Sequence, residues 1–339
     1  MSMATMIQAQ RPGTALVLGA TGGVGGETAR QLRDAGWGVR ALARGLATET
    51  AQQAGMTWLR GDAMNRQDVA RAAMGCEVIV HAVNPPGYRR WGELVLPMID
   101  NTISVAQAQG ATIVLPGTIY NYGSDAFPVL KETSPQHPQT RKGAIRVELE
   151  HRLQVASGRG VRVIVLRAGD FFGPRAGNNW FSQGLVKPGR PVTVVQAPGA
   201  RGVGHQWSYL PDVARTLVQV LARRDTLAPF AAFHMAGHWD ADGTQMSAAI
   251  VRVAGRHGVR PRVRAFPWWL LRLAAPFVPT LRELMEMRYL WRQPLRMDNA
   301  RLVELLGAEP LTPLDEAVEA TLRGLGCLPE SPVRAKVLA

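Results

Sequence analysis

Short runs of apolar residues, each followed by a stretch with helical spacing, recur along the first half of the chain. The first run, Thr14–Leu18, ends in a glycine-rich turn that leads into the helical pattern of Glu27–Ala35. Continuous apolar strands that alternate with helices are typical of a parallel sheet covered on both faces. The pattern therefore predicts an α/β fold with a doubly wound parallel sheet. Further strands are expected at Val39–Ala43, Met56–Leu59, Val78–Val83, Thr112–Leu115 and Val161–Leu166.

The alternation of strands and helices becomes irregular after residue 174. Gly- and Pro-rich loops continue to Trp207, and a helix is expected to begin at Pro211, with Asp212 as its cap. The sequence thus predicts a larger domain and a smaller C-terminal lobe that serves as substrate or lid region. The expected division is a main domain over 13–175, to which 205–225 returns, and a lobe over 176–204 and 226–335.

One apolar segment in the C-terminal third, Phe266–Pro279, contains two adjacent tryptophans. It is too short and too interrupted to cross a bilayer, and it suits core or lid packing, a subunit interface or contact with a membrane surface. The first dozen residues are polar and lack the apolar stretch of a signal peptide. We therefore expect a cytoplasmic protein with no membrane span.

The formal net charge of +13 raises the question of nucleic-acid binding. The arginines are spread over every segment, and no short stretch gathers five or six basic residues, so we expect no nucleic-acid partner. The two cysteines, Cys76 and Cys327, are far apart, and the histidines show no HExxH spacing. Neither a disulfide framework nor a metal site is therefore expected. The absence of GxSxG and P-loop motifs argues against a serine hydrolase and an NTPase.

A glycine-rich turn follows the first strand and opens the first helix. Its glycines have GxxGxxG spacing, which allows a tight turn, close approach of backbone amides to a pyrophosphate, and close packing of helix on strand. The helix N-terminus then faces the phosphate charge. The sequence therefore predicts a Rossmann-type dinucleotide site, formed by Gly19, Thr21, Gly22, Gly23, Val24 and Gly25.

The end of the second strand indicates which dinucleotide is bound. An acidic residue at this position would hold the ribose 2′-hydroxyl of NAD, but the sequence has Arg44 there. An arginine suits the 2′-phosphate of NADP through charge-assisted hydrogen bonds. We therefore expect NADP(H), rather than NAD, with Arg44 as the phosphate ligand.

With these residues in place, Thr14–Ala222 resembles the short-chain dehydrogenase/reductase superfamily, in particular its extended and atypical members of the NAD-dependent epimerase/dehydratase kind. Thr118 with the downstream Tyr122-Gly123 is similar to the family's Ser/Thr and Tyr-Gly, and Trp207–Ala214 to the segment before its next helix. The resemblance implies a homodimer as well as a bound dinucleotide. It also implies further cofactor contacts at Gly61, Asp62, Ala82, Val83 and Asn84, and in the loop Arg167–Pro174 at Ala168 and Phe171.

The catalytic helix departs from this family pattern. Where such enzymes carry YGxxKxxxE, the chain has Lys142 and Arg146 in place of the tyrosine and the lysine, while Gly143 and Glu150 still match. In the family's mechanism the tyrosine transfers a proton and the lysine lowers its pKa and holds the ribose. We expect Thr118 to orient a substrate oxygen, Lys142 or Tyr120 to move the proton, and Arg146 to hold the cofactor ribose. A purely cofactor-binding role for Lys142 is the alternative.

A second departure concerns the substrate. Nucleotide-sugar enzymes of this family often carry an arginine where this chain has His205, which is at most partly charged near neutral pH. The sequence therefore favours an NADP(H)-dependent oxidoreductase that acts on a small carbonyl, alcohol or activated alkene. The alternatives are a non-catalytic NADP(H)-binding redox sensor or assembly factor and, third, an epimerase or dehydratase that reuses its cofactor.

Overall fold

The computed structural model describes residues 12–85, 90–177, 179–277, 281 and 285–329 of the 339-residue chain. Its centre is an eight-stranded sheet with the order β12-β8-β6-β5-β1-β2-β4-β3. All neighbouring strands are parallel except β3, which runs antiparallel to β4 at one edge. The strands are β1 (Thr14–Leu18), β2 (Gly38–Ala43), β3 (Thr50–Gln53), β4 (Met56–Arg60), β5 (Val78–His81), β6 (Thr112–Gly117), β8 (Val163–Arg167) and β12 (Phe230–His234).

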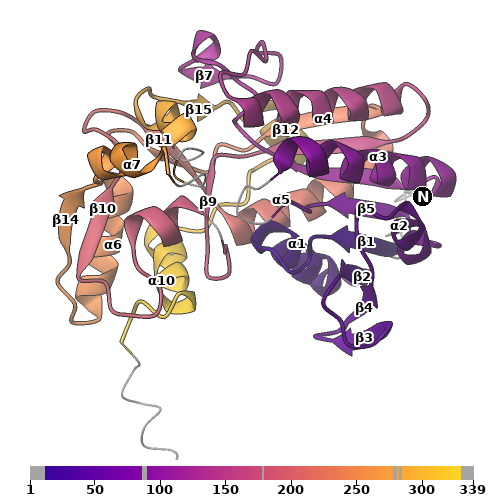
Figure 1. Ribbon diagram of the computed structural model, residues 1–339, viewed down its shortest axis with the longest axis horizontal. Helices are drawn as coiled ribbons and strands as arrows, with labels where there is room; N and C mark the ends of the chain where they lie inside the picture. Colours follow the sequence, from indigo (N-terminus) through magenta and orange to yellow (C-terminus); the bar gives the residue numbers. More distant parts are fainter. Residues whose placement is uncertain (1–11, 86–89, 178, 278–280, 282–284, 330–339) are drawn as a thin grey trace, which may run out of the picture.

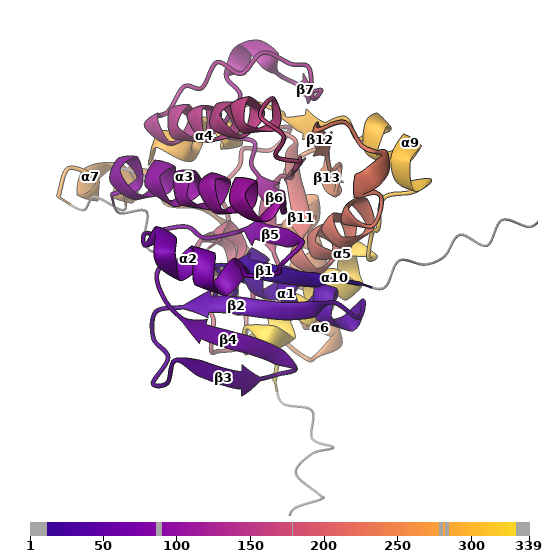
Figure 2. The same ribbon diagram turned by 90° about the vertical axis from the view of Figure 1, so that its right-hand side faces the viewer.

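Helices cover both faces of this sheet (Figure 2). On one face α1 (Gly23–Asp34) packs against α5 (Leu210–Leu221). On the other face lie α2 (Arg66–Ala73), α3 (Trp91–Gln109) and α4 (Arg141–Ser157). Each helical layer closes over its own cluster of buried apolar residues, because the alternating side chains of the strands point to opposite faces. The doubly wound Rossmann architecture predicted from the sequence is confirmed.

Two strands of the main sheet were not expected from the sequence. β3 is a short, mostly exposed edge strand whose polar composition has no alternating pattern. β12 comes from residues assigned above to the C-terminal lobe, yet it extends the sheet by pairing with β8. The helix α9 (Ala300–Leu306) covers β12, and its Leu302 is buried in the same cluster as α5. Part of the 226–335 range therefore belongs to the sheet domain in space.

The expected capping role of Asp212 is wrong. Helix α5 begins at Leu210 after Tyr209, so Asp212 lies inside its first turn. The buried carboxylate of Asp212 instead accepts hydrogen bonds from the backbone amide and the hydroxyl of Thr312, at 2.7 and 2.8 Å. It also pairs with Arg215. Asp212 thus holds the loop at Thr312 against α5. Because the two residues are far apart in the chain, the local sequence does not indicate this contact.

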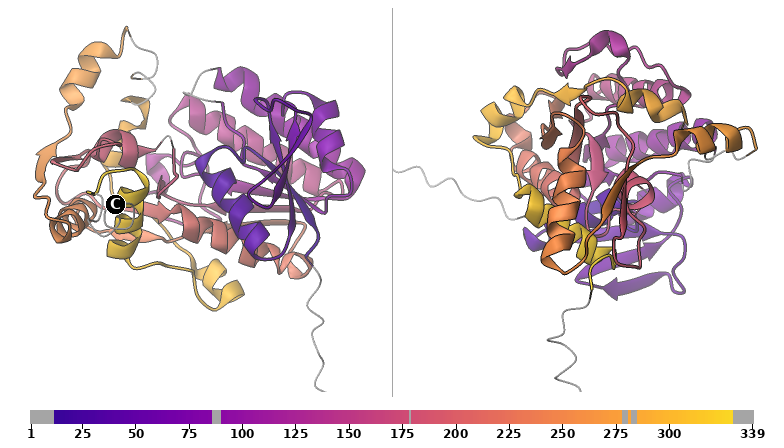
Figure 3. Two further views of the ribbon diagram at one scale, coloured as in Figure 1. Left: turned by 90° about the horizontal axis from the view of Figure 1, so that it is seen from below. Right: turned by 90° about the vertical axis from the view of Figure 1, so that its left-hand side faces the viewer.

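A second body stands beside the carboxyl ends of the sheet (Figures 1 and 3). Its small sheets pair β9 (Asp170–Phe172) with β11 (His205–Tyr209), β11 with β13 (His238–Asp240), and β10 (Val194–Ala197) with β14 (Arg262–Ala265). Helices α6 (Gln245–Arg256) and α10 (Leu314–Gly324) pack together behind them. A short pair, β7 (Val129–Leu130) with β15 (Arg296–Met297), and helix α7 (Trp268–Ala274) complete the described elements used below. This body has its own core, rich in aromatic side chains.

Candidate cofactor and catalytic site

The glycine turn between β1 and α1 is held where only glycine fits. Gly19 has φ +88°, and a Cβ on it would lie 2.5 Å from the carbonyl oxygen of Ala82. A Cβ on Gly25 would lie 2.3 Å from the carbonyl oxygen of Gly19, and one on Gly23 would lie 2.4 Å from that of Ala176. These approaches bring the turn against the end of β5 and against the second body.

The N-terminus of α1 is open to a ligand at this turn. Gly22 caps the helix with no side-chain hydrogen bond and is exposed, as is Thr21. The first helical amides, at Gly23, Val24 and Gly25, have no intrahelical acceptor at this end of a helix. An exposed helix N-terminus with free amide hydrogens suits the charge of a pyrophosphate. The turn therefore fits the dinucleotide that the sequence predicts.

Three further groups of predicted cofactor-binding residues lie at the carboxyl ends of neighbouring strands. Arg44 follows β2 directly and is exposed. Gly61 and Asp62 follow β4, and Asp62 accepts a hydrogen bond from the amide of Met64 at 2.9 Å, which closes a local turn. Ala82, Val83 and Asn84 follow β5. Ligands of open α/β sheets bind at this edge, so the predicted residues share the side of the sheet that fits them.

The two cations that replace the family's tyrosine and lysine lie together on α4. Lys142 and Arg146 are both buried, and both lie over the ring of Trp91, with Nζ at 5.8 Å and Cζ at 5.2 Å from its centroid. Arg146 donates a hydrogen bond from Nη2 to Oδ1 of Asn84 at 3.1 Å. This bond joins a predicted catalytic residue to a predicted cofactor residue at the end of β5.

Local sequence explains why α4 begins where it does. The hydroxyl of Thr140 accepts a hydrogen bond from the amide of Gly143 at 3.0 Å, which caps the helix. A Cβ on Gly143 would lie 2.3 Å from the carbonyl oxygen of Tyr120. Gly143 therefore lets the first turn of α4, with Lys142, approach the loop that carries Thr118 and Tyr120.

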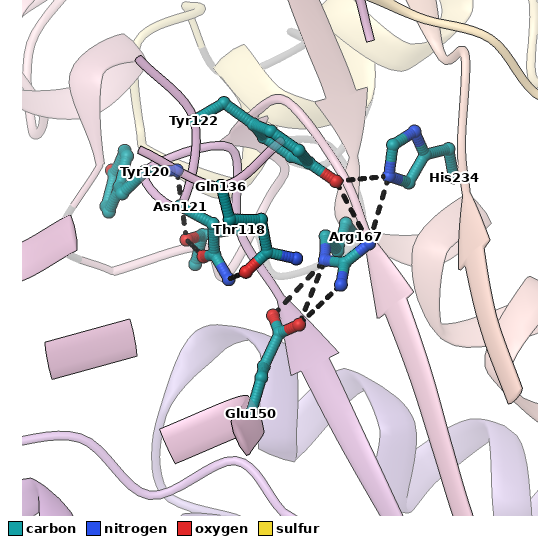
Figure 4. Close-up of polar contacts among 8 residues, drawn as sticks. All are labelled: Thr118, Tyr120, Asn121, Tyr122, Gln136, Glu150, Arg167 and His234. Atoms are coloured by element: carbon teal, nitrogen blue, oxygen red, sulfur yellow. Dashed lines mark hydrogen bonds and ion pairs between the residues drawn. The ribbon is translucent and has the colours of Figure 1, made fainter. Parts of the chain in front are cut away.

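That loop follows β6 and is ordered by its own polar groups (Figure 4). The Thr118 hydroxyl accepts a hydrogen bond from the amide of Tyr120 at 3.2 Å and lies 3.5 Å from Oδ1 of Asn121. Asn121 in turn donates to Gln136 at 3.1 Å. Thr118 and Tyr120 are half-buried, so each keeps part of its side chain accessible. Both predicted residues thus lie beside the start of α4.

A buried polar network behind this loop was missed by the sequence analysis (Figure 4). Arg167, at the end of β8, forms a buried ion pair with Glu150 of α4 and donates to the hydroxyl of Tyr122 at 3.0 Å. The Tyr122 hydroxyl donates to Nε2 of His234 at 2.9 Å, and Nδ1 of His234 donates to the carbonyl of Leu130 at 3.2 Å. From the sequence, Tyr122 and Glu150 are matches to the family pattern and Arg167 begins a loop, but nothing there indicates that the three side chains meet.

The titratable groups of this network keep one protonation state near neutral pH. Burial raises the pKa of Tyr122 to about 12, although the charge of Arg167 opposes the shift. Burial, aided by the charge of Arg167, lowers the pKa of His234 to about 3. Tyr122 therefore stays protonated and His234 stays neutral, and the network stabilises the junction of β8, β12 and α4.

The loop after β8 connects the two bodies. Ala168 is buried and Phe171 is half-buried against the sheet core. His205 on β11 is buried, lies 2.8 Å from Oδ2 of Asp170 through Nε2, and stacks on Trp291 with ring centroids 3.7 Å apart. The cavity that His205 and Trp291 line measures about 10 Å³, which is room for roughly one water molecule.

The sequence of residues 15–236 matches the family model "NAD dependent epimerase/dehydratase family". The chain belongs to this family. A comparison with curated protein sequences finds no match. Among solved structures, a UDP-galactose 4-epimerase is similar with a TM-score of 0.64 and 17% identity, covering 96% of this chain and 100% of that one.

Two further epimerase/dehydratase-like structures carry NAD in their descriptions. One is MoeE5 in complex with UDP-glucuronic acid and NAD, with a TM-score of 0.68, 17% identity and coverage of 92% and 98%. The other is UDP-glucose 4-epimerase from Brucella ovis in complex with NAD, with a TM-score of 0.69, 15% identity and coverage of 93% and 98%. At these identities the likeness shows the fold, and the membership of the NAD-dependent epimerase/dehydratase family shows the cofactor class.

Proposed function

We propose that this chain is a nicotinamide-dinucleotide-dependent oxidoreductase that acts on a small carbonyl, alcohol or activated alkene, with NADP(H) as its preferred cofactor. The observation that carries the proposal is the Arg146–Asn84 hydrogen bond. This bond joins α4, which carries Lys142 and Arg146, to the carboxyl end of β5, against which the glycine turn packs. A cation pair at this position could serve both the substrate and the cofactor.

The bound dinucleotide would supply or accept a hydride. The amides of the glycine turn would bind its pyrophosphate, and Arg44 would bind the 2′-phosphate of NADP, because a guanidinium gives a phosphate two parallel charge-assisted bonds. The NAD named with the compared structures makes NAD the competing cofactor. Arg44, in a position where NAD-binding folds use a carboxylate, is the reason to prefer NADP.

The chain's own residues would then handle the substrate oxygen. Lys142 would donate or accept a proton at Nζ, because it stands at the position of the family's tyrosine and is buried beside Arg146 over the Trp91 ring. The Thr118 hydroxyl would orient the oxygen. Arg146, held by Asn84, would fix the cofactor ribose, while Tyr120, a half-buried residue, would be the second proton carrier.

A nucleotide-sugar epimerase is a weaker candidate for this chain. The position where family members carry a diphosphate-binding arginine is His205, which is engaged with Asp170 and stacked on Trp291. A cavity of about 10 Å³ beside it is far below the several hundred Å³ of a typical ligand pocket. His205 is therefore already engaged by groups of the protein.

The test combines cofactor binding with turnover. NADPH and NADH would be titrated by fluorescence, and oxidation of the bound cofactor followed against a panel of aldehydes, ketones and enones. We expect Lys142→Ala to bind NADPH within about threefold of wild type but to lose about 10²–10⁴-fold in turnover, the usual contribution of a general acid or base. Tyr120→Phe is the matched variant for the second proton carrier.

The outcomes separate the proposal from its alternatives. Undiminished turnover in Lys142→Ala, with loss in Tyr120→Phe, would transfer the proton step to Tyr120. Tight NADPH binding with no oxidation across the panel would contradict the oxidoreductase and favour a non-catalytic NADP(H)-binding sensor. Interconversion of a nucleotide sugar without net cofactor turnover would favour the epimerase.

A further inference from the structure

Helix α7 stands out from the second body as an arm (Figures 2 and 3). Trp268 fixes its root, because its indole Nε1 donates to the carbonyl of Pro198 at 2.8 Å. The Trp268 ring also packs against Trp180 and Phe266, with centroids 5.7 and 4.9 Å apart. The arm is therefore anchored through side chains at its root, while Trp269, Leu270 and Leu273 remain exposed.

The outward side of the arm is apolar and exposed. Trp269, Leu270 and Leu273 lie within about one quarter of the circumference of α7, and Phe277 follows shortly after the helix ends at Ala274. Trp269 is 67% exposed, Leu273 65% and Phe277 85%. We call these four residues the α7 face. Large apolar side chains gathered at this exposure mark a contact surface rather than scattered surface residues.

Arginines lie beside the root of the arm and in the strand that precedes it. β14, which leads into the arm, is exposed along its length and carries Arg262 and Arg264. The guanidinium of Arg288 lies 5.1 Å from the Trp268 ring centroid. Burial, together with the charges of Arg292 and Arg272, lowers the pKa of Arg288, so these three cations lie near one another.

The sequence of this segment has few acids to balance that charge. Over residues 260–292 the acidic residues are Glu283 and Glu286. The arginines are Arg260, Arg262, Arg264, Arg272, Arg282, Arg288 and Arg292. A partner of the α7 face must therefore accept apolar side chains together with the positive charge of the neighbouring arginines.

We propose that the α7 face docks on the surface of an anionic lipid bilayer. Trp and Phe at the level of the headgroups, Leu side chains at the acyl boundary and arginines against lipid phosphates are the chemistry of an interfacial helix. A second copy of the chain meets this face less well. In a two-fold contact the same arginines would oppose each other, and like charges facing one another disfavour association.

Docking of this kind does not require a transmembrane segment. In the part of the chain that the structure describes, no helix is long and apolar enough to cross a membrane. The α7 face would insert only its side chains, and the electrostatic attraction would be screened by salt. The proposal concerns where the protein works and is independent of which substrate or cofactor the catalytic site uses.

The test is flotation of the full-length protein with vesicles of phosphatidylcholine alone and of phosphatidylcholine with phosphatidylglycerol. We expect binding to the anionic vesicles that weakens about tenfold or more in Leu273→Asp, because the side chain no longer transfers to an apolar site. Met74→Asp is the matched control, since Met74 is also 65% exposed but lies on the sheet domain. It should bind as wild type does.

Charge reversal tests the second half of the proposal. Arg272→Glu should weaken binding to anionic vesicles by at least about fivefold, the loss expected for one basic residue near the surface. Arg159→Glu, at an exposed turn of the sheet domain, should not. Absence of binding to either vesicle would overturn the proposal, as would binding that Leu273→Asp leaves unchanged. Self-association in ultracentrifugation that Leu273→Asp abolishes would overturn it in favour of a second copy.

Discussion

Two cations share the buried side of α4 at the point where the family places a tyrosine and a lysine. Their common contact is the Trp91 ring, whose face attracts positive charge, and Arg146 is further held by Asn84. In the proposed function single residues would decide the chemistry: the fold is that of the family, but the groups proposed to move protons differ. Arg44, at the end of β2, is the residue proposed to decide the cofactor.

Arg44→Glu should reverse the cofactor preference. The substitution replaces a group that attracts the 2′-phosphate of NADP with one that repels it and can accept from the ribose hydroxyl of NAD. A charged hydrogen bond contributes roughly 1.5–3 kcal/mol, so we expect the ratio of NADPH to NADH affinity to fall about 10–100-fold. Fluorescence titration of both cofactors measures it. An unchanged ratio would show that Arg44 is an ordinary surface residue.

At the scale of elements, the approach of α4 to the loop after β6 depends on Gly143. A Cβ there would meet the carbonyl oxygen of Tyr120 at 2.3 Å and Cβ of Pro138 at 2.7 Å. Neither neighbour can move away easily, because one is backbone and the other a proline ring. The glycine of the family motif is thus explained by packing between two elements.

Gly143→Ala should destabilise the protein by about 1–3 kcal/mol despite the higher helix propensity of alanine, because the added methyl group overpacks the contact. Gly255→Ala is the matched control in the last turn of α6. Its Cβ would meet nothing within 4 Å, so we expect a gain of about 0.5–1 kcal/mol. Urea unfolding gives both values. Equal effects of the two substitutions would rule out the packing explanation.

The ion pair between α4 and β8 supports a second prediction at this scale. Glu150→Gln would leave the buried guanidinium of Arg167 without its countercharge, which costs about 3–5 kcal/mol. Glu148→Gln on the same helix removes a largely exposed partner of Arg152 and should cost less than about 1 kcal/mol. Denaturant unfolding distinguishes them, and similar losses would mean that the Glu150–Arg167 pair contributes little.

The sequence predicted the elements that follow a strong local pattern, and it failed where distant residues decide. The β1–turn–α1 unit and the strands β2, β4, β5, β6 and β8 are visible because each is a continuous apolar run or a glycine motif. β12 has a similar run, but only its pairing with β8 identifies it as part of the sheet. The same reason hid the network of Tyr122, Glu150, Arg167 and His234, whose members come from the loop after β6, α4, β8 and β12.

At the scale of the whole molecule, two buried neutral histidines link stability to pH. Burial, then the charge of Arg146, lowers the pKa of His81 to about 3, and His234 reaches about 3 through burial and Arg167. Between pH 6.5 and pH 3 the unfolded chain therefore binds protons that the folded chain does not. The stabilisation is fully present above pH 6.5 and is lost as the pH falls towards 3.

We expect the free energy of unfolding to fall below pH 6 by up to about 1.4 kcal/mol per pH unit for each of these histidines. Urea unfolding at pH 7, 6 and 5 measures the slope. His81→Asn should reduce this pH dependence of the free energy of unfolding by the contribution of one histidine. His137→Asn, at an exposed site, should leave it closer to that of wild type. A slope unaffected by His81→Asn would mean that His81 becomes protonated in the folded protein.

The position of β12 at the sheet edge also bears on how the protein is made. The ribosome releases the chain from its N-terminus, so β8 emerges well before residues 230–234, which cover its free side. During that interval β8 is an unprotected apolar edge that can pair with another nascent chain. In a fragment that ends before residue 230, β12 is missing and the edge of β8 is never covered. We therefore expect such a fragment to aggregate or to remain bound to chaperones.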